Sequence, residues 1–352
     1  YLTLSPSGYM GRYTFPALPA YMILLVFGLL AWVPSRARTE LAVALPVGMF
    51  FFGAATLATY LIPVYSPPRG LAKLPNGAKP LDATLGDLAV LKGYSVSATE
   101  ARPGERVYVT LYWLPLGRSD MPFSVYIHLI DNDDILVAQR DTYPGLGRAP
   151  TTAWTPGQLF ADRYLVMIPE TAYAPTTARW EAGLWQADTG DRAYVLDEAG
   201  QPVASGVIFG ELAIQSLPGL VPNPVDMNFG GELRLKGYSL PSRVLSPGQP
   251  FEFTVHWQPE AEAARGLRPR YFFVHVVAAD GSIWANNAFA VSGEAQTVQP
   301  TLARDTPAGL YSLLFGVFDE DGQEQKRLKI LADDGHEIDD QVRLTGVRVI
   351  AP

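Results

Sequence analysis

An internal repeat limits what this chain can fold into. The five residues Leu91–Ser95 return unchanged as Leu235–Ser239. After each copy come a Pro-Gly pair and a strand-like run, Val107–Leu111 in the first copy and Phe251–Val255 in the second, at a constant spacing. Solenoid repeats have a period of about 20 to 50 residues, and this repeat is much longer. The sequence therefore predicts two tandem domains of one fold.

The pattern of each domain is that of an all-β protein. From Leu81 onward, apolar and polar residues alternate in short runs, separated by Pro-Gly, Asp-Gly and Thr-Gly pairs that favour tight turns. About seven short strands in such a length are typical of an immunoglobulin-like β-sandwich. We expect one sandwich, module 1, over residues 81–216 and a second, module 2, over residues 225–352. A proline-rich linker, residues 217–224, would join them.

Two uncharged stretches precede the modules. Residues 15–34 and 41–64 contain no Asp, Glu, Lys or Arg. About 20 apolar residues span the hydrocarbon core of a bilayer as a helix. The sequence therefore predicts a transmembrane helical hairpin over residues 15–64, between an exoplasmic segment, residues 1–14, and a connector, residues 65–80. The protein would then be an integral protein of the cell membrane.

The basic residues give the orientation. Arg36 and Arg38 lie in the short loop between the two stretches and favour a cytoplasmic loop, which would place both modules outside the cytoplasm. The basic residues on the outer flanks of the two stretches weaken this difference in positive charge; they are Arg12, Arg69, Lys73 and Lys79.

Composition excludes several classes of function. The net charge is -8, so the chain has no broad basic surface for phosphates, and we expect no nucleic-acid partner. The chain has no cysteine, which excludes disulfides, zinc-thiolate sites and iron–sulfur clusters. The motifs G-x-S-x-G, P-loop and H-E-x-x-H are missing as well, so no residue is assigned a catalytic role.

Some residues of module 1 have a binding interpretation and a structural one. Asp131, Asp133 and Asp134 share a turn that could bind a divalent cation such as calcium, although a solvated acidic turn is the simpler interpretation. No other cofactor is expected. Tryptophans and tyrosines beside carboxylates could stack on sugar rings. The carbohydrate-binding candidates are Trp154, Trp180 and Trp185, with Tyr143 and Tyr194 as further exposed aromatics.

The repeated aromatic and histidine positions are predicted to be structural. Tyr94 and Tyr238 would pack across the two sandwiches. His128 and His275 occupy equivalent strand positions, which makes the histidine a property of the fold. With only four histidines in the chain, partners for a metal or a catalytic role are scarce.

A short motif ahead of the first apolar stretch resembles a known family. Gly11–Pro19, with sequence GRYTFPALP, resembles the G-R-Y-x-F/L-P-A-x-P stretch before a late helix in GT-C type glycosyltransferases, the family 39 and protein-mannosyltransferase-like enzymes. The modules are similar to β-sandwich tails of such enzymes in Chloroflexota-type bacteria, above all in Val125–Asp131, Leu136–Asp141 and Pro150–Gly157.

This resemblance implies an integral membrane enzyme that transfers sugar from a polyprenyl-phosphate donor to a glycan or protein acceptor. Arg12 and Tyr13 would lie near the donor phosphate, and the modules would bind the acceptor or act as spacers. The acidic catalytic residue of the family lies many helices upstream, so this chain would be the C-terminal portion of such an enzyme. Since the chain starts at Tyr1, we expect a processed product or a part of a longer polypeptide.

A second hypothesis is a non-enzymatic, membrane-anchored accessory subunit of a larger membrane complex, whose partners would be other membrane proteins. Further membrane spans upstream of the chain would favour the enzyme over the subunit.

Overall fold

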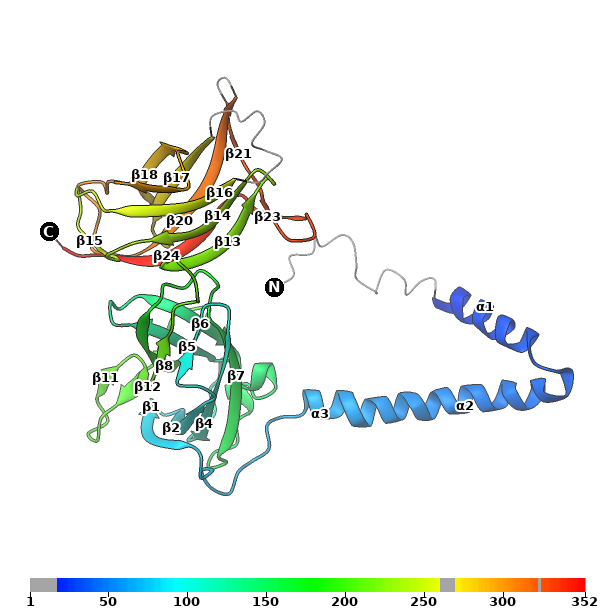
Figure 1. Cartoon of the computed structure of the whole chain (residues 1–352). Helices are drawn as coiled ribbons and strands as arrows, with labels where there is room; N and C mark the ends of the chain where they lie inside the picture. The colour runs from blue at the N-terminus through cyan, green and yellow to red at the C-terminus, as the bar shows by residue number, and fades with distance from the viewer. Residues whose placement is uncertain (1–17, 260–269, 322–323, 352) are drawn as a thin grey trace. The chain divides into compact units, whose positions relative to one another are not determined.

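The computed structural model describes residues 18–259, 270–321 and 324–351 (Figure 1). The chain divides into two compact units, Tyr1–Ser66 and Pro67–Pro352. The first unit is helical and the second contains both β-modules, and each unit is described by itself below.

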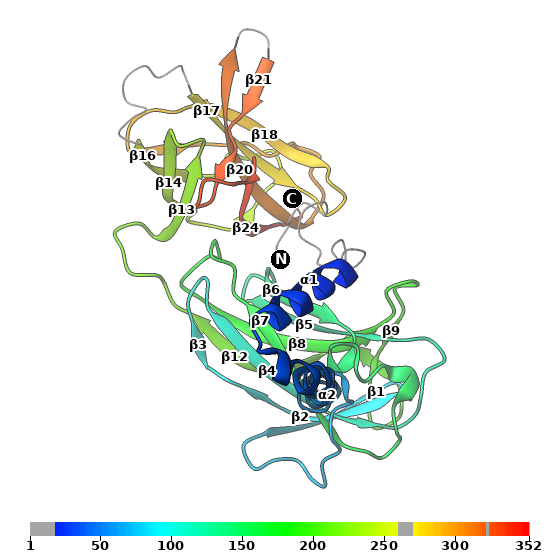
Figure 2. The same ribbon diagram turned by 90° about the vertical axis from the view of Figure 1, so that its right-hand side faces the viewer.

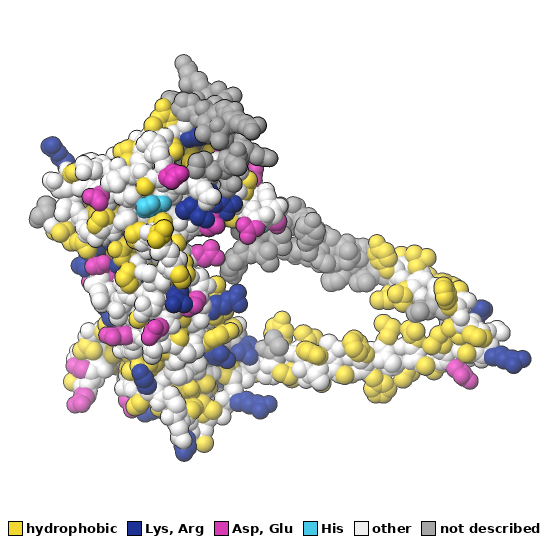
Figure 3. Space-filling model, in the orientation of Figure 1, with side chains coloured by type: hydrophobic (Ala, Val, Ile, Leu, Met, Phe, Trp, Pro, Cys, Tyr) yellow, Lys and Arg dark blue, Asp and Glu magenta, His cyan; other side chains and the backbone are white. Residues whose placement is uncertain are grey.

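The helical unit contains one candidate membrane span. Its elements are α1 (Leu18–Ala31), η2 (Ser35–Ala37), α2 (Arg38–Thr56), a π-helical turn η3 (Leu57–Leu61) and α3 (Ile62–Tyr65). The continuous helix Ser35–Leu61 has 27 residues, and none of its most apolar window is buried. At 1.5 Å per residue it is about 40 Å long, which exceeds a hydrocarbon core of about 30 Å. Figure 3 shows hydrophobic side chains along this helix.

The predicted pair of membrane spans over residues 15–64 needs correction. Helix α1 has 14 residues in the described part of the chain and reaches only about 21 Å. It ends at Ala31 before Pro34, where the backbone is extended and starts the separate turn η2. Among the described residues, therefore, one helix is long and apolar enough to cross a membrane, and the two helices are not a hairpin of two spans.

Module 1 is built from two six-stranded sheets. Their strand orders are β11-β10-β1-β2-β4-β7 and β3-β12-β8-β5-β6, with β9 pairing to β8. In Figure 2, β12, β8 and β5 lie side by side. The strands are β1 (Lys79–Leu85), β2 (Ala89–Val96), β3 (Glu100–Ala101), β4 (Arg106–Pro115), β5 (Ser124–Asp131), β6 (Leu136–Thr142), β7 (Phe160–Met167), β8 (Thr176–Trp185), β9 (Arg192–Ala193), β10 (Val195–Leu196), β11 (Pro202–Ala204) and β12 (Val207–Ile214).

Module 2 has the same architecture. Its sheets have the orders β19-β16-β14-β13-β22-β23 and β15-β24-β20-β17-β18, with β21 pairing to β20. The strands are β13 (Asn223–Phe229), β14 (Leu233–Ser239), β15 (Val244–Leu245), β16 (Phe253–Pro259), β17 (Arg270–Val277), β18 (Ile283–Ala290), β19 (Ala295–Val298), β20 (Gly309–Asp321), β21 (Glu324–Arg327), β22 (Ile330–Leu331), β23 (Glu337–Asp339) and β24 (Val342–Val349).

The repeat in the sequence is a repeat in the fold. Strand β1 pairs with β2 as β13 pairs with β14. Both ladders shift register directly after a proline, between Pro80 and Ala83 and between Pro224 and Met227. The sandwich-like, mostly β architecture is as predicted. Each module is larger than the predicted seven strands, because short strands such as β3 and β15 extend each sheet. Pro224 lies in β13, so the linker is shorter than predicted.

Each module encloses its own apolar core. Trp113, Trp180 and Tyr164 are fully buried in module 1, while Phe272 and Phe315 fill the corresponding space in module 2. Tyr94 and Tyr238 of the repeated motif are 6% and 0% exposed, which confirms their structural role. Such burial of aromatic rings between two sheets dominates the packing energy of a sandwich.

Candidate functional site

The predicted sugar-binding tryptophans are core residues. Trp180 is 0% exposed and Trp154 is 3% exposed, and the Trp154 indole donates its N–H to the carbonyl of Ala149 at 2.8 Å. Neither ring offers a face to a sugar, so their assignment to carbohydrate binding was wrong. Trp185 is half-buried in β8, where its indole nitrogen is buried without a hydrogen bond. Arg12 and Tyr13, the predicted lipid-phosphate residues, lie outside the described residues.

The acidic turn of module 1 contains a buried carboxylate. It connects β5 to β6, and Asp131 Oδ1 accepts the backbone N–H groups of Asp133 and Ile135, both at 3.0 Å. The Asp131 side chain is 0% exposed. A buried carboxylate needs a counter-charge, because burial removes its hydration. The turn is therefore not a merely solvated loop.

The counter-charges come from module 2. Arg243 places one guanidinium nitrogen 2.6 Å from Asp131 Oδ2 and another 2.9 Å from Asp133 Oδ2, and its own side chain is 3% exposed. Arg348 reaches Asp134 Oδ2 at 2.7 Å. Asp131 Oδ2 is buried and accepts no hydrogen bond, so the charge of this carboxylate is balanced by the ion pair with Arg243. One acidic turn is thus held by two arginines of the neighbouring module.

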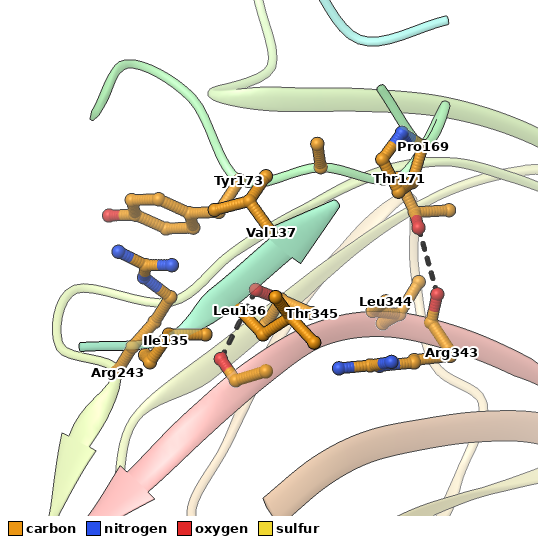
Figure 4. Close-up of a pocket in the computed structure, with 12 residues that line it drawn as sticks. Ile135, Leu136, Val137, Pro169, Thr171, Tyr173, Arg243, Arg343, Leu344 and Thr345 are labelled. Atoms are coloured by element: carbon orange, nitrogen blue, oxygen red, sulfur yellow. Dashed lines mark hydrogen bonds between the residues drawn. The ribbon is translucent and has the colours of Figure 1, made fainter. Parts of the chain in front are cut away.

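Further contacts surround these ion pairs and form what we call the inter-module junction. The Arg243 guanidinium stacks on the ring of Tyr173 with 4.2 Å to the centroid, as Figure 4 shows. Tyr173 donates its hydroxyl to the carbonyl of Leu240 at 3.2 Å. The Tyr238 hydroxyl donates to the carbonyl of Thr171 at 3.1 Å. The Ala174 N–H donates to the Asn223 side chain, and Thr171 Oγ1 donates to the carbonyl of Arg343.

A small cavity lies in the junction. It is lined by residues of module 1, including Ile135 and Tyr173, and by Arg243, Arg343 and Thr345 of module 2 (Figure 4). Its volume of about 60 Å³ is far below the roughly 300 to 1,000 Å³ of a small-molecule site. A cavity of this volume holds a few water molecules. The junction is therefore built to hold two modules together, and it has no room for an organic ligand.

The electrostatics of the turn argue against a cation site. Arg179 donates a hydrogen bond to Asp134 Oδ1, the oxygen that Arg348 does not contact. This hydrogen bond is the main cause that lowers the pKa of the Asp134 carboxyl from its usual value. Arginine nitrogens therefore occupy carboxylate oxygens that a divalent cation would need. Among the described residues, no group of three or more acidic or histidine side chains could hold a metal ion.

The repeated histidines lie on the outer face of each module. His128 is half-buried, its ring lies 4.8 Å from that of Tyr126, and its Nε2 lies 3.3 Å from Asp141. Arg192 lies over the Tyr126 ring at 5.1 Å, and Gly183 provides the space, since a Cβ there would meet the ring at 2.6 Å. Module 2 repeats the arrangement with Phe273, His275, Gly316 and Arg327.

The two outer faces differ in polarity. The Tyr126 hydroxyl donates to the carbonyl of Ser205 at 2.7 Å, and burial raises its pKa, with the Glu181 carboxylate adding to this effect. Burial also lowers the pKa of His275. The shared ring-and-arginine stack confirms that the histidine position belongs to the fold, as predicted.

The junction residues were missed because they interrupt the repeat. Arg348 pairs with Val244 in β15 as Ala213 pairs with Glu100 in β3, so Arg348 corresponds to Ala213. By the constant spacing, Arg243 corresponds to Thr99. These departures from the repeat were readable in the sequence, but only an alignment of the two modules strand by strand would have marked them.

Comparisons with known proteins give no family. No protein-family model matches the chain, and no curated protein matches it. Two solved structures of alpha-2-macroglobulin from Escherichia coli, one trypsin-activated and one in the native conformation, are each 12% identical. They cover 75% and 81% of this chain, which spans only 16% and 15% of theirs, and both TM-scores are 0.21. This likeness carries no argument about function.

Proposed function

We propose that the chain is a membrane-anchored pair of sandwiches whose modules act as a rigid spacer outside the cytoplasm. The observation that carries the proposal is the helix Ser35–Leu61, which is apolar, 27 residues long and unburied. A helix that is apolar on all sides and unburied in its own protein is stabilised by lipid. Arg36 and Arg38 at its N-terminal end favour a cytoplasmic start and thus external modules.

The inter-module junction supports the spacer role. A tether between independent domains needs few contacts, whereas here a buried ion pair and several hydrogen bonds join the modules. The junction cavity is too small for an acceptor sugar, and two of the three candidate tryptophans are buried. A spacer is therefore better supported than an acceptor-binding role.

The larger protein that would carry this spacer is proposed from the Gly11–Pro19 motif. A polyprenyl-phosphate-sugar-dependent glycosyltransferase of the GT-C type is the first candidate, and a complex with a separate accessory subunit is the second. With Ser35–Leu61 as the only crossing, residues 1–34 and the modules would be on opposite sides of the membrane. Arg12 and Tyr13 would then be cytoplasmic. An external donor site at these two residues and external modules would both be possible only if another segment of the protein crossed the membrane.

Surface labelling tests the proposal. The chain has no cysteine, so Tyr194→Cys, at a side chain 49% exposed, gives a single reactive thiol in module 1. We expect a membrane-impermeant maleimide to label it in intact cells, and the protein to stay in the membrane pellet at alkaline pH. Labelling only after lysis would place the modules inside, and release at alkaline pH would refute the anchor. For the enzyme hypothesis, Arg12→Ala in the whole protein should lower sugar transfer.

A further inference from the structure

The connector is fastened to one end of module 1. Gly70 forms an antiparallel bridge with Phe160, and the Leu71 N–H donates to the carbonyl of Leu159 at 2.7 Å. Pro67 and Pro68 line a small cleft together with Trp154. The chain is thus fixed to module 1 within a few residues of the last helix, α3, which ends at Tyr65.

The length of chain between helix and module is short. Three residues lead from Tyr65 to Pro68, and an extended chain spans at most about 3.6 Å per residue. Pro68 itself lies against the loop after β6, since a Cβ on Gly145 would come within 3.3 Å of its ring. Any surface to which the end of α3 is held must therefore lie within about 11 Å of Pro68.

The loop beside Pro68 displays a leucine in a disfavoured conformation. Leu146, in the turn η4 (Pro144–Gly147), has φ +55° and is 52% exposed. A left-handed backbone is unusual for a bulky residue. The loop is fixed to the body of module 1 by a hydrogen bond to a buried residue: the Gly145 N–H donates to Asp162 Oδ2 at 2.7 Å, and Asp162 is 1% exposed. Arg148 Nε donates to the carbonyl of Gly145 at 2.8 Å.

A second loop, residues 116–123, is joined to the first. The buried hydroxyl of Thr151 accepts the Phe123 N–H at 2.9 Å and the Ser119 hydroxyl at 2.6 Å. Arg118 Nε donates to the carbonyl of Trp154 at 2.6 Å. We call residues 116–123 and 143–154 the loop pair. Its exposed apolar side chains are Leu116 (46%), Met121 (52%), Tyr143 (44%) and Leu146 (52%).

The charges of the loop pair differ from those of the chain. The loop pair contains two arginines, Arg118 and Arg148, and one acid, Asp120, while the whole chain has a net charge of -8. The acidic turn of residues 186–191 follows Trp185 of β8, which pairs with Ser124 directly after the loop 116–123, so Asp188 and Asp191 lie at the edge of the loop pair and outside it. Exposed leucine, methionine and tyrosine beside arginine are the side chains that favour the membrane interface.

We propose that the loop pair, with Leu146 foremost, inserts into the headgroup region of the lipid bilayer. The proposal rests on the proposed function, because it takes Ser35–Leu61 as a membrane anchor. The short connector then brings the loop pair to the lipid surface, and the pinned backbone of Leu146 points a leucine away from the core of module 1. Module 1 is thereby braced against the membrane.

Single labels test the depth of the loop. The full chain carrying Leu146→Cys or Leu310→Cys is labelled with an environment-sensitive fluorophore in vesicles of phosphatidylcholine and phosphatidylglycerol. Leu310, in module 2, is also 52% exposed and serves as the matched control. We expect nitroxide-labelled lipid to quench the label at position 146 several-fold more than the label at position 310. Equal quenching at both positions would overturn the proposal.

Two further readouts separate the remaining outcomes. A label at position 146 that is shielded from aqueous iodide but unquenched by nitroxide lipid would indicate a protein partner and would also overturn lipid contact. Flotation of the same samples with the vesicles tests the membrane anchor. If the chain floats but the label is not quenched by lipid, the proposed function stands and the lipid contact of the loop pair is refuted. If the chain does not float, both the membrane anchor and the lipid contact are refuted. With Leu146→Asn, which suits a left-handed backbone, a label at Met121→Cys should show weaker lipid quenching.

Discussion

Removal of Arg243 should weaken the junction more than any surface charge would. The Asp131 carboxylate is 0% exposed in the unmodified chain, and in Arg243→Ala it loses the guanidinium nitrogen that lies 2.6 Å from Oδ2. Its other oxygen still accepts the N–H groups of Asp133 and Ile135. Breaking a buried ion pair by removing one partner costs about 3–5 kcal/mol, since the remaining charge is buried uncompensated. The lost stacking on Tyr173 acts in the same direction.

Urea unfolding of the full chain in detergent, followed by circular dichroism, measures this loss. The control is Arg348→Ala, which breaks the neighbouring pair with Asp134, where the side chains are 42% and 51% exposed. An exposed pair contributes at most about 1 kcal/mol. The double variant Asp131→Asn, Arg243→Met should lose less than Arg243→Ala, because no unpaired charge is then buried.

The comparison between the two arginines decides the argument. If Arg243→Ala loses no more free energy of unfolding than Arg348→Ala, the Asp131 carboxylate is not desolvated at the junction, and the rigid-spacer proposal loses its main support. An equal loss in the single and double variants would show that packing, not charge, accounts for the effect.

Three other substitutions test the fold around the junction and the core. Gly346→Ala should lower the free energy of unfolding by about 1–3 kcal/mol, because a Cβ there would lie 2.5 Å from Ile135 of module 1, whereas Gly309→Ala, with 3.7 Å of clearance, should be close to neutral in the same urea titration. Burial raises the pKa of Asp162 from 3.8 to about 6, so the folded state holds its proton more tightly than the unfolded state. Module 1 should therefore lose about 3 kcal/mol of stability as the pH rises from 3.8 through 6, and Asp162→Asn should abolish that slope; a flat profile in the unmodified chain would contradict the buried carboxyl. Trp180→Ala should cost about 3–5 kcal/mol in thermal unfolding, as expected for a core ring; a change confined to sugar binding would restore the original assignment.

The fold class was predictable because it depends on local patterns. Alternation along β2 and β14 and the repeated motif specify two equivalent sandwiches, and the repeat places Tyr94 and Tyr238 in equivalent core positions. Trp180 was misassigned because a local pattern does not tell which face of a strand meets the other sheet. Trp180, in β8, points into the core.

The acidic turn shows the same limit for a site. Asp131–Ile135 has the composition of a cation loop or a solvated turn, and both interpretations treat the turn by itself. Arg243, which neutralises Asp131, is 112 residues away in the sequence and belongs to the other module. No periodicity or motif connects two such positions.

The sequence by itself determined the two-fold repeat, the β-rich modules and the apolar N-terminal segment, because each follows from the order of residues along a short stretch. The tertiary structure alone decided that, in the part of the chain that it describes, one helix rather than two has the length of a membrane span. It also decided that Trp154 and Trp180 lie inside module 1 and that an aspartate of one module pairs with an arginine of the next. These outcomes depend on burial and on pairing between distant residues. Burial and distant pairing arise only when the strands have packed and excluded water.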